Sequence, residues 1–429
     1  MGSVNSHMGA RWTFGSRLPR AGSPALAAYF RSYYKMVLLI APDNLLLYAP
    51  FDGDTEDASG NDNTPSTESG GIIYPSYLVA PNGGGCVQLA EATTNLIINP
   101  SFEVDLYGWH DQGTVTKTRD NERAYVGSYA MKCVAGANNT QYGAVIYNVV
   151  TGSPVAQDSY SLQARVYADA NAAGTTAKIQ INETGGASGD QETAAQEITL
   201  EEGWNYLSCS GTVNKTDRTS LYVIVRILDA GVVAGDTVWW DAIQMEKKSY
   251  LTPYCDGSLG DGHSWSGTAH NSTSSRTKTN LQYTLNLPDE FTISTWAIPM
   301  TLPSETTSYS RLWQWSADAN NNVFLAYAES ADKAYIAWRG DGSTSHIFDI
   351  DLNRFQPYHY VLTYDGTTAK LYRDGSSVDQ VEPTAFAATP DVLYIGAEDT
   401  YNNLNGWLAH FAVWNKALDA AEVEYISAP

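Results

Sequence analysis

The sequence predicts an all-β protein made of antiparallel β-sandwiches. Short runs of alternating apolar and β-branched residues recur along most of its 429 residues. Clusters of Gly, Asn, Asp and Pro separate these runs about every 8–12 residues, a spacing typical of sandwiches and barrels. Only the stretch ALDAAEVEYIS (417–427) has the Ala and Glu content expected of a helix, with Asp419 at its start.

The predicted strands form two groups with a connector between them. Residues 256–279 are rich in Gly, Ser, Thr and Asn, which indicates the connector. In the second group, YHYVLTYDG (358–366) and AKLYRDG (369–375) form a hairpin around an Asp-Gly turn. The clearest runs of the first group are 129–136, 143–150, 159–168, 177–183, 204–211, 220–228 and 237–244.

The formal charge of −22 is unevenly distributed. Residues 11–39 carry five Arg or Lys and no acid, so the rest of the chain has 20 basic and 47 acidic residues and a charge of −27. Such an acidic body repels nucleic acid and anionic membranes, so neither is expected as a partner. The acidity is compatible with bound Ca²⁺ or with solubility alone.

Four cysteines, at positions 86, 133, 209 and 255, show no CxxC spacing, which argues against zinc and redox motifs. Cys86 and Cys255 flank the middle of the chain, where a disulfide would clamp it. A Cys133–Cys209 bridge is a further possibility, because connectivity does not follow from sequence.

The middle of the chain, residues 94–250, resembles the family 4/9-type carbohydrate-binding modules. This resemblance implies a jelly-roll sandwich of two antiparallel sheets. The matching segments are NLIINPSFE (95–103) with a following Trp109, GSYAMKCVAG (127–136), SYSLQARVYA (159–168) and VWWDAIQME (238–246).

Members of this family commonly hold a structural Ca²⁺ between the first and last strands. Carried over, the resemblance implies Glu103 and Asp241 as ligands, with backbone carbonyls completing the shell. Ca²⁺ takes about 6–8 oxygen ligands, and carboxylates on neighbouring strands supply the charged ones. The alternative is a surface Glu and an Asp that caps a strand.

Two outer pieces, residues 40–92 and about 270–429, resemble the concanavalin A-like, laminin-G-like jelly rolls. One departure stands out: Ala409 and His410 replace the acidic pair often found after the Gly-aromatic start, which argues against a metal site on the last strand. The matching segments are LLLYAPFDGD (45–54), GGGCVQLAE (83–91), FTISTWAIP (291–299), YHYVLTYDGTTAKLYRDG (358–375) and NGWLAHFAVWNKALDAAEVEYI (405–426).

These resemblances divide the chain into three parts. Residues 1–39 hold a tag-like remnant and a basic segment, residues 40–93 plus 256–429 form a discontinuous jelly roll, and residues 94–255 form a jelly roll inserted in it. Insertions at surface turns are tolerated because the entropic cost of loop closure grows slowly with length.

The combination of TTNLIINPSFE (93–103), the connector TPYCDGSLGDGHSWSGTAHNSTSSR (252–276) and the outer jelly roll resembles tail or capsid-surface proteins of bacteriophages. The resemblance implies a location on the virion surface. We expect residues 11–39 to contact other virion proteins or, alternatively, to be a poorly ordered terminus. Since single sugar sites are weak, we also expect a homo-oligomer, which supplies avidity.

No catalytic residues are predicted. A retaining glycosidase needs two carboxylates about 5–5.5 Å apart, which on a strand requires alternating acids. Asp349 and Asp351 alternate but lack a third acid, and no GxSxG, HExxH or phosphate-loop pattern occurs.

Sugar binding needs exposed aromatic rings beside polar side chains. Trp313 and Trp315 share one strand face because they lie two residues apart. Each ring has the alternative of filling a core, as we expect for Trp296 and Trp414. The candidate glycan-binding residues are Trp109, Tyr142, Tyr147 and Trp204 in the inserted module, and Trp313, Trp315, Trp338 and Arg339, with Asn321 nearby, in the outer one.

The sequence therefore favours a non-enzymatic virion surface protein, of adhesin or decoration type, that binds glycans of the host surface. Two other hypotheses stay open. The lectin-like folds could serve only as structural spacers that stabilise a capsid, or the chain could be an accessory domain of a polysaccharide depolymerase.

Overall fold

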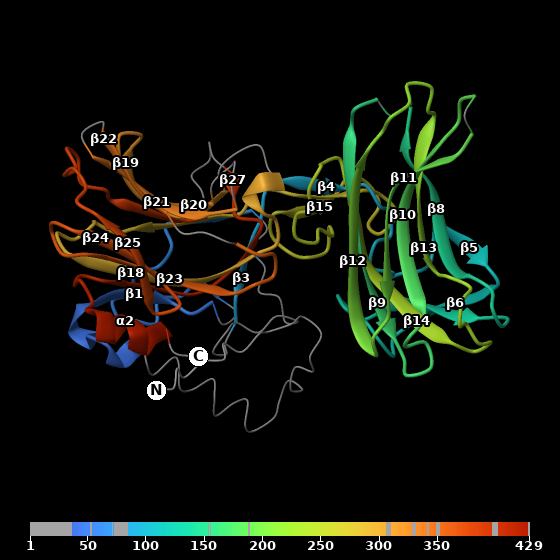
Figure 1. Ribbon diagram of the computed structural model, residues 1–429, viewed down its shortest axis with the longest axis horizontal. Helices are drawn as coiled ribbons and strands as arrows, with labels where there is room; N and C mark the ends of the chain where they lie inside the picture. The colour runs from blue at the N-terminus through green and yellow to red at the C-terminus, as the bar shows by residue number, and fades with distance from the viewer. Residues whose placement is uncertain are drawn as a thin grey trace, which may run out of the picture.

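The computed structural model confirms the all-β prediction: nearly all of its regular elements are strands in antiparallel sheets. Figure 1 shows two β-rich bodies side by side, with β4 (Thr93–Asn95) and β15 (His263–Trp265) between them. The structure describes residues 37–427 except 52–53, 71, 73–84, 153, 155, 188, 306–309, 328–331, 341–342, 349–351 and 397–401. The basic segment and the Asp349–Asp351 pair lie largely or wholly outside these residues.

The body on the right of Figure 1 is a sandwich of two five-stranded sheets. We call them the β13 sheet, with the order β11-β10-β13-β8-β5, and the β9 sheet, with the order β12-β9-β14-β7-β6. Their strands are β5 (Trp109–Gly113), β6 (Val115–Asp120), β7 (Ala130–Ala135), β8 (Tyr142–Thr151), β9 (Ser159–Ala168), β10 (Thr176–Thr184), β11 (Gln191–Thr199), β12 (Gly203–Thr212), β13 (Ser220–Ile227) and β14 (Thr237–Glu246).

The body on the left also has two large sheets. One has the order β1-β28-β18-β23-β24-β25 with β3 beside β28, and the other the order β2-β17-β26-β19-β20-β21-β22 with β27 beside β19. Their strands are β1 (Leu45–Ala49), β2 (Thr67–Ser69), β3 (Val87–Leu89), β17 (Asn280–Thr284), β18 (Phe291–Pro299), β19 (Ser310–Asp318), β20 (Asn321–Tyr327), β21 (Ala334–Gly340), β22 (Ser343–Phe348), β23 (Tyr358–Tyr364), β24 (Ala369–Arg373), β25 (Ser376–Val381), β26 (Val392–Ile395), β27 (Asn402–Asn403) and β28 (Gly406–Trp414).

Strands from both ends of the chain pair within this left body. β1 and β3 pair antiparallel with β28, and β2 pairs with β17. The strands that precede residue 90 therefore belong to the same sheets as strands that follow residue 279. This is the pairing that an insertion between the two halves of one sandwich requires.

Each sandwich buries its own apolar core through the two-residue alternation of its strands. On β10, Ile179 and Ile181 point into the core, where Ala164 and Val166 of β9 also lie. A further cluster lies under the helix α2 (Ala420–Ser427), on the outer side of the β1-to-β25 sheet. The helix begins where Asp419 accepts hydrogen bonds of 2.9 Å from the amides of Ala421 and Glu422. Two short 3-10 helices, η1 (Pro42–Asn44) and η2 (Pro303–Glu305), lie elsewhere in the described residues.

A buried arginine ties together the segments that enter and leave the right-hand sandwich. Arg276, on β16 (Ser274–Arg276), is 2% exposed, and β16 pairs with β4 and β15. Its guanidinium donates to the carbonyl of Glu91 at 3.0 and 3.2 Å, to that of Pro253 at 2.7 Å and to that of Tyr254 at 3.2 Å. The segment before β4 and the segment after β14 are thus both hydrogen-bonded to this one side chain.

The carboxylate of Glu91 joins the same neck to both bodies. It accepts hydrogen bonds from Lys248 and Tyr250 at 2.9 Å each, and from Asn405, next to β28, at 2.8 Å. Away from the neck, Phe355 of the left body packs edge-on against Tyr206 of β12, with ring centroids 5.4 Å apart. Since the joint is cross-linked by buried polar groups, the two sandwiches form a fixed pair.

All four cysteines are free thiols. Neither the Cys86–Cys255 clamp nor a Cys133–Cys209 bridge is present, so these two suggestions are wrong for this structure. Burial raises the pKa of Cys86 and Cys133 to about 12, and these thiols stay protonated and unreactive at neutral pH. The Arg276–Glu91 neck provides the clamp in their place.

We expect Arg276→Ala to lower the free energy of unfolding by at least about 3 kcal/mol, because it leaves several buried carbonyls without donors. Urea unfolding followed by circular dichroism measures the change. Lys215→Ala is the control, since Lys215 is exposed and should stay within about 0.5 kcal/mol of the parent. Equal stability of the two variants would show that the neck contributes little.

Candidate functional site

The structure places five of the seven predicted sugar-binding aromatic rings inside cores. Trp109 is 5% exposed and Tyr142 is fully buried in the right-hand core. Trp313, Trp315 and Trp338 are at most 1% exposed in the left-hand core. A sugar ring cannot reach these faces, so their prediction as glycan platforms is wrong.

The polar ends of these buried rings confirm the core role. The indole Nε1 of Trp315 donates to the carbonyl of Leu285 at 2.6 Å, and that of Trp338 to Thr384 at 3.0 Å. The indole of Trp109 donates to the carbonyl of Asn99 at 3.3 Å. Arg339 is half-buried, and its guanidinium lies 5.3 Å over the ring of Phe324.

Tyr147 and Trp204, the other two predicted rings, are accessible, but they lie on different sheets. Tyr147 is 53% exposed on β8 of the β13 sheet, whereas Trp204 is half-buried on β12 of the β9 sheet. The two sheets pack face to face around one core. The two rings therefore belong to opposite outer faces of the sandwich.

Three rings gather on the outer face of the β13 sheet. Tyr147 lies 5.6 Å from Tyr222 of β13 and 5.6 Å from His110 of β5, measured between ring centroids. Tyr222 projects outward because its neighbours Leu221 and Val223 point into the core. The alternation in SLYVIVRI (220–227) could have revealed Tyr222 from the sequence, but no pattern singled out His110.

Beside these rings lies a chain of hydrogen-bonded polar side chains. Arg226 of β13 donates to Gln141 at 2.9 Å and to Gln180 of β10 at 2.8 Å, and Gln180 donates to Asn182 at 2.9 Å. Gln180 and Asn182 alternate on β10 with core residues and therefore share the outer face. Sequence reasoning missed all four of these polar residues.

Two donors of this chain have no partner within the part of the chain that the structure describes. They are Nε of Arg226 and Nδ2 of Asn182, and Asn182 is only 5% exposed. A buried donor without an acceptor costs about 1–3 kcal/mol. Atoms of the same kind also occur inside the core, at the hydroxyl of Tyr142 and the indole Nε1 of Trp240. The face therefore combines accessible rings with an ordered but largely buried chain of polar side chains.

Tyr222 contributes a hydroxyl to the same face. Burial and, next, the carboxylate of Asp190 raise the pKa of Tyr222 to about 12, so the phenol stays protonated at neutral pH. Its hydroxyl donates to Asp190 at 3.3 Å. An accessible carboxylate and a phenol thus lie beside the rings as further hydrogen-bonding groups for a sugar.

Glu103 and Asp241 lie on either side of the loop 121–129. Glu103 accepts hydrogen bonds from the amides of Ser128 and Tyr129 at 2.9 and 3.0 Å. Asp241 accepts from the amides of Tyr125 and Val126 at 2.7 and 3.0 Å. The two carboxylates therefore fix the path of this loop.

Burial strongly affects one member of this carboxylate pair. Asp241 is fully buried, and burial raises its pKa well above the usual range, with the charge of Glu103 adding to the effect. Across the described ranges, no three His, Cys, Asp or Glu side chains converge as a metal cluster. A hard cation such as Ca²⁺ would need backbone carbonyls in addition to these two carboxylates.

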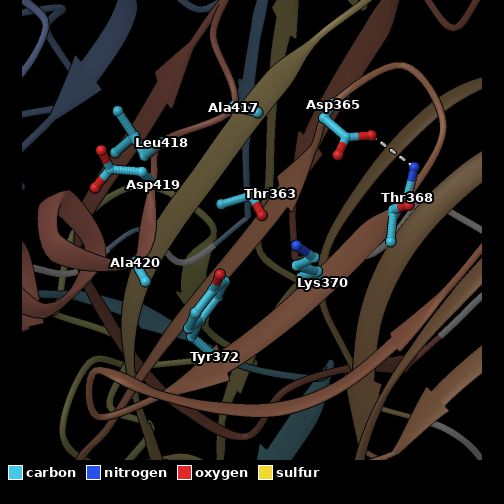
Figure 2. Close-up of a pocket in the computed structure, with 9 residues that line it drawn as sticks. All are labelled: Thr363, Asp365, Thr368, Lys370, Tyr372, Ala417, Leu418, Asp419 and Ala420. Atoms are coloured by element: carbon cyan, nitrogen blue, oxygen red, sulfur yellow. Dashed lines mark hydrogen bonds between the residues drawn. The ribbon is translucent and has the colours of Figure 1, made fainter.

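A shallow cavity of about 290 Å³ lies between β23, β24 and the start of α2. Figure 2 shows Asp365 and Thr368 at one end and Asp419 and Ala420 at the other. Tyr372, the aromatic residue in its lining, is 6% exposed. The carboxylate of Asp365 accepts a hydrogen bond of 2.7 Å from the amide of Thr368. The cavity thus lacks the exposed ring of the β13 face.

Comparisons with known proteins agree with the two bodies. Residues 94–230 match a carbohydrate binding domain model, and residues 266–424 match the concanavalin A-like lectin/glucanases superfamily model of laminin-G type. The chain thus contains a carbohydrate-binding domain and a lectin-like domain. No curated protein sequence matches the chain.

Solved structures are similar to part of the chain at low sequence identity. A heptameric SAP-like pentraxin of Limulus polyphemus is 17% identical over 35% of this chain and 75% of its own, with a TM-score of 0.29. The receptor binding domain of botulinum neurotoxin type G is 13% identical over 35% of this chain and 40% of its own, with a TM-score of 0.30. This chain thus spans well under half of that binding domain.

We expect Trp315→Ala to lower the free energy of unfolding by about 3–5 kcal/mol, because it opens a large cavity in a closed core. Trp204→Ala removes the same ring from outside the apolar clusters and should cost about 1 kcal/mol. Thermal and urea unfolding of the two variants measure the difference. Similar losses would contradict the assignment of Trp315 to the core.

Proposed function

We propose that this protein is a non-enzymatic, glycan-binding surface protein of a virus particle, and that the outer face of the β13 sheet binds sugars of the host surface. The observation that carries the glycan site is the pair of accessible rings, Tyr147 and Tyr222, beside the exposed carboxylate of Asp190. The particle location rests on the resemblance of residues 93–103 and 252–276 to bacteriophage surface proteins.

The binding mode follows from the two kinds of group on this face. The apolar face of a pyranose packs on Tyr147 and Tyr222, and the loss of water from this contact favours binding. The hydroxyl groups of the sugar donate hydrogen bonds to the exposed carboxylate of Asp190. Because the hydroxyl of Tyr222 already orients this carboxylate, little conformational entropy is lost on binding.

Tyr147→Ala should raise the dissociation constant for a neutral oligosaccharide selected on a glycan array by about tenfold, which corresponds to about 1.4 kcal/mol. Tyr147→Phe keeps the ring and should bind like the parent. Tyr425→Ala is the matched control, since Tyr425 is similarly exposed, at 46%, on α2 of the other body. Calorimetric titration of each variant gives the constants.

The proposal fails if the array shows no neutral glycan bound at high protein concentration, or if Tyr425→Ala weakens binding as much as Tyr147→Ala. Incubation with cell-surface polysaccharide tests the enzymatic alternative. New reducing ends would identify a depolymerase rather than a binding protein. Detection of the chain in purified particles by mass spectrometry tests the virion location.

We further propose that Glu103 and Asp241 hold a structural Ca²⁺. The buried carboxyl of Asp241 and the half-buried Glu103 beside the loop 121–129 support this, since a divalent cation would offset the cost of ionising Asp241. The ion would be structural: it would hold the loop against β14 and supply no reaction chemistry.

Chelation should therefore lower the melting temperature of the parent protein. Saturation at about 100 times the dissociation constant contributes about 2.7 kcal/mol, equivalent to about 5–10 °C in a domain of this size. Differential scanning fluorimetry with EGTA and with added Ca²⁺ measures the shift. Glu103→Gln with Asp241→Asn should melt at one temperature in both buffers, whereas an unchanged parent would disprove the metal.

A further inference from the structure

A row of aromatic side chains crosses the outer face of the β9 sheet, opposite the β13 face. Trp204 of β12 pairs in register with Tyr167 of β9, and Tyr167 pairs with Trp239 of β14. Successive rings meet edge to face, with centroids 5.6 and 5.7 Å apart. Tyr125, from the loop 121–129, extends the row with its ring 5.3 Å from Trp204. We call these four residues the aromatic row.

The aromatic row is a surface feature and not part of a core. Tyr125, Tyr167 and Trp204 are half-buried, and Trp239 is 5% exposed. None of the four belongs to the apolar clusters of either sandwich. Folding of the β9 sheet therefore does not explain why large rings stand in line on its outer side.

Arginine side chains lie on the faces of these rings. The guanidinium carbon of Arg123 is 5.0 Å from the ring centre of Tyr167, and that of Arg165 is 4.6 Å from Tyr125. Arg165 also lies 4.2 Å from the ring of Tyr206. A guanidinium stacked on a ring keeps its N–H donors in its own plane, free to bind a planar carboxylate with two hydrogen bonds.

Neither guanidinium group is ion-paired within the described residues, although Asp241 lies opposite Arg165 in the strand register. Lys132, which lies 5.0 Å over Trp239, forms ion pairs with Asp120 and Glu122. In contrast, no ion pair among the described residues includes Arg123 or Arg165. Two unpaired cations on a chain of net charge −22 mark a local site for an anion.

We propose that the aromatic row is a second binding surface, specific for a carboxylated glycan chain built of uronate residues. Sugar rings pack against the accessible edges of Trp204 and Tyr167, and their carboxylates pair with Arg123 and Arg165. The surface is distinct from the β13 face, because the two outer faces lie on opposite sides of one sandwich. One protein would thus contact neutral and acidic saccharides from opposite sides.

Titration of the full chain with oligogalacturonate by calorimetry tests this surface. Arg123→Gln and Trp204→Ala should each weaken binding by about tenfold or more, while Arg123→Lys, which keeps the charge but loses the planar fork, should lie between. Lys215→Gln makes the same change in net charge past the far end of β12 and should bind like the parent. Tyr147→Ala, on the opposite face, should also leave this binding unchanged.

The proposal is overturned if the parent does not bind oligogalacturonate, or if Lys215→Gln loses as much affinity as Arg123→Gln. Binding of heparin without oligogalacturonate would overturn the choice of carboxylate over sulfate. Arg123 is exposed, so Arg123→Gln decides the matter even if Trp204→Ala unfolds. Neutral-glycan binding that is lost only with Tyr147, and oligogalacturonate binding lost only with Arg123, separate this surface from the proposed function.

Discussion

The arrangement of the molecule depends on the buried Arg276 guanidinium and its neighbour Glu91. A sandwich inserted by two chain crossings would otherwise swing on its linkers, since domains joined by short segments move relative to one another by default. Here the crossings share one cation that is 2% exposed and bonded to carbonyls of both segments. Displacing either segment would leave a buried charge without acceptors, which is strongly unfavourable.

A fixed neck determines which faces of the inserted sandwich can meet a ligand. The part of β12 around Tyr206 packs against Phe355 of the left-hand body. The aromatic row begins next to that contact, where Trp204 precedes Tyr206 by two residues on the same strand face. The β13 face is on the other side of the core and takes no part in the joint. Rigid mounting benefits weak sugar sites, because less entropy is lost when several sites bind together.

The sequence predicted the fold class well because strand alternation is a local property. The same alternation could not decide which side of a strand faces the core. Trp313 and Trp315 share a face, as predicted, but the face is the inner one. Tyr147 and Trp204 are accessible, and their role in sugar binding stays a prediction, whereas Gln180, Asn182 and Arg226 were missed. These three residues come together across strands β10 and β13. Their proximity depends on the pairing register of the two strands, which no single segment encodes.

Two groups of buried polar side chains in this protein differ in how completely they are hydrogen-bonded. In the neck, Arg276, Glu91 and Glu246 have partners for their buried polar atoms, as expected of groups that hold a fold together. On the β13 face, Arg226 and Asn182 are hydrogen-bonded to Gln180, yet each retains a buried donor without an acceptor. The same is true of Tyr142 and Trp240 inside the core, so a buried donor without an acceptor does not by itself mark a binding site. The accessible rings of Tyr147 and Tyr222, which a sugar can reach, are therefore the stronger basis for the proposed glycan face.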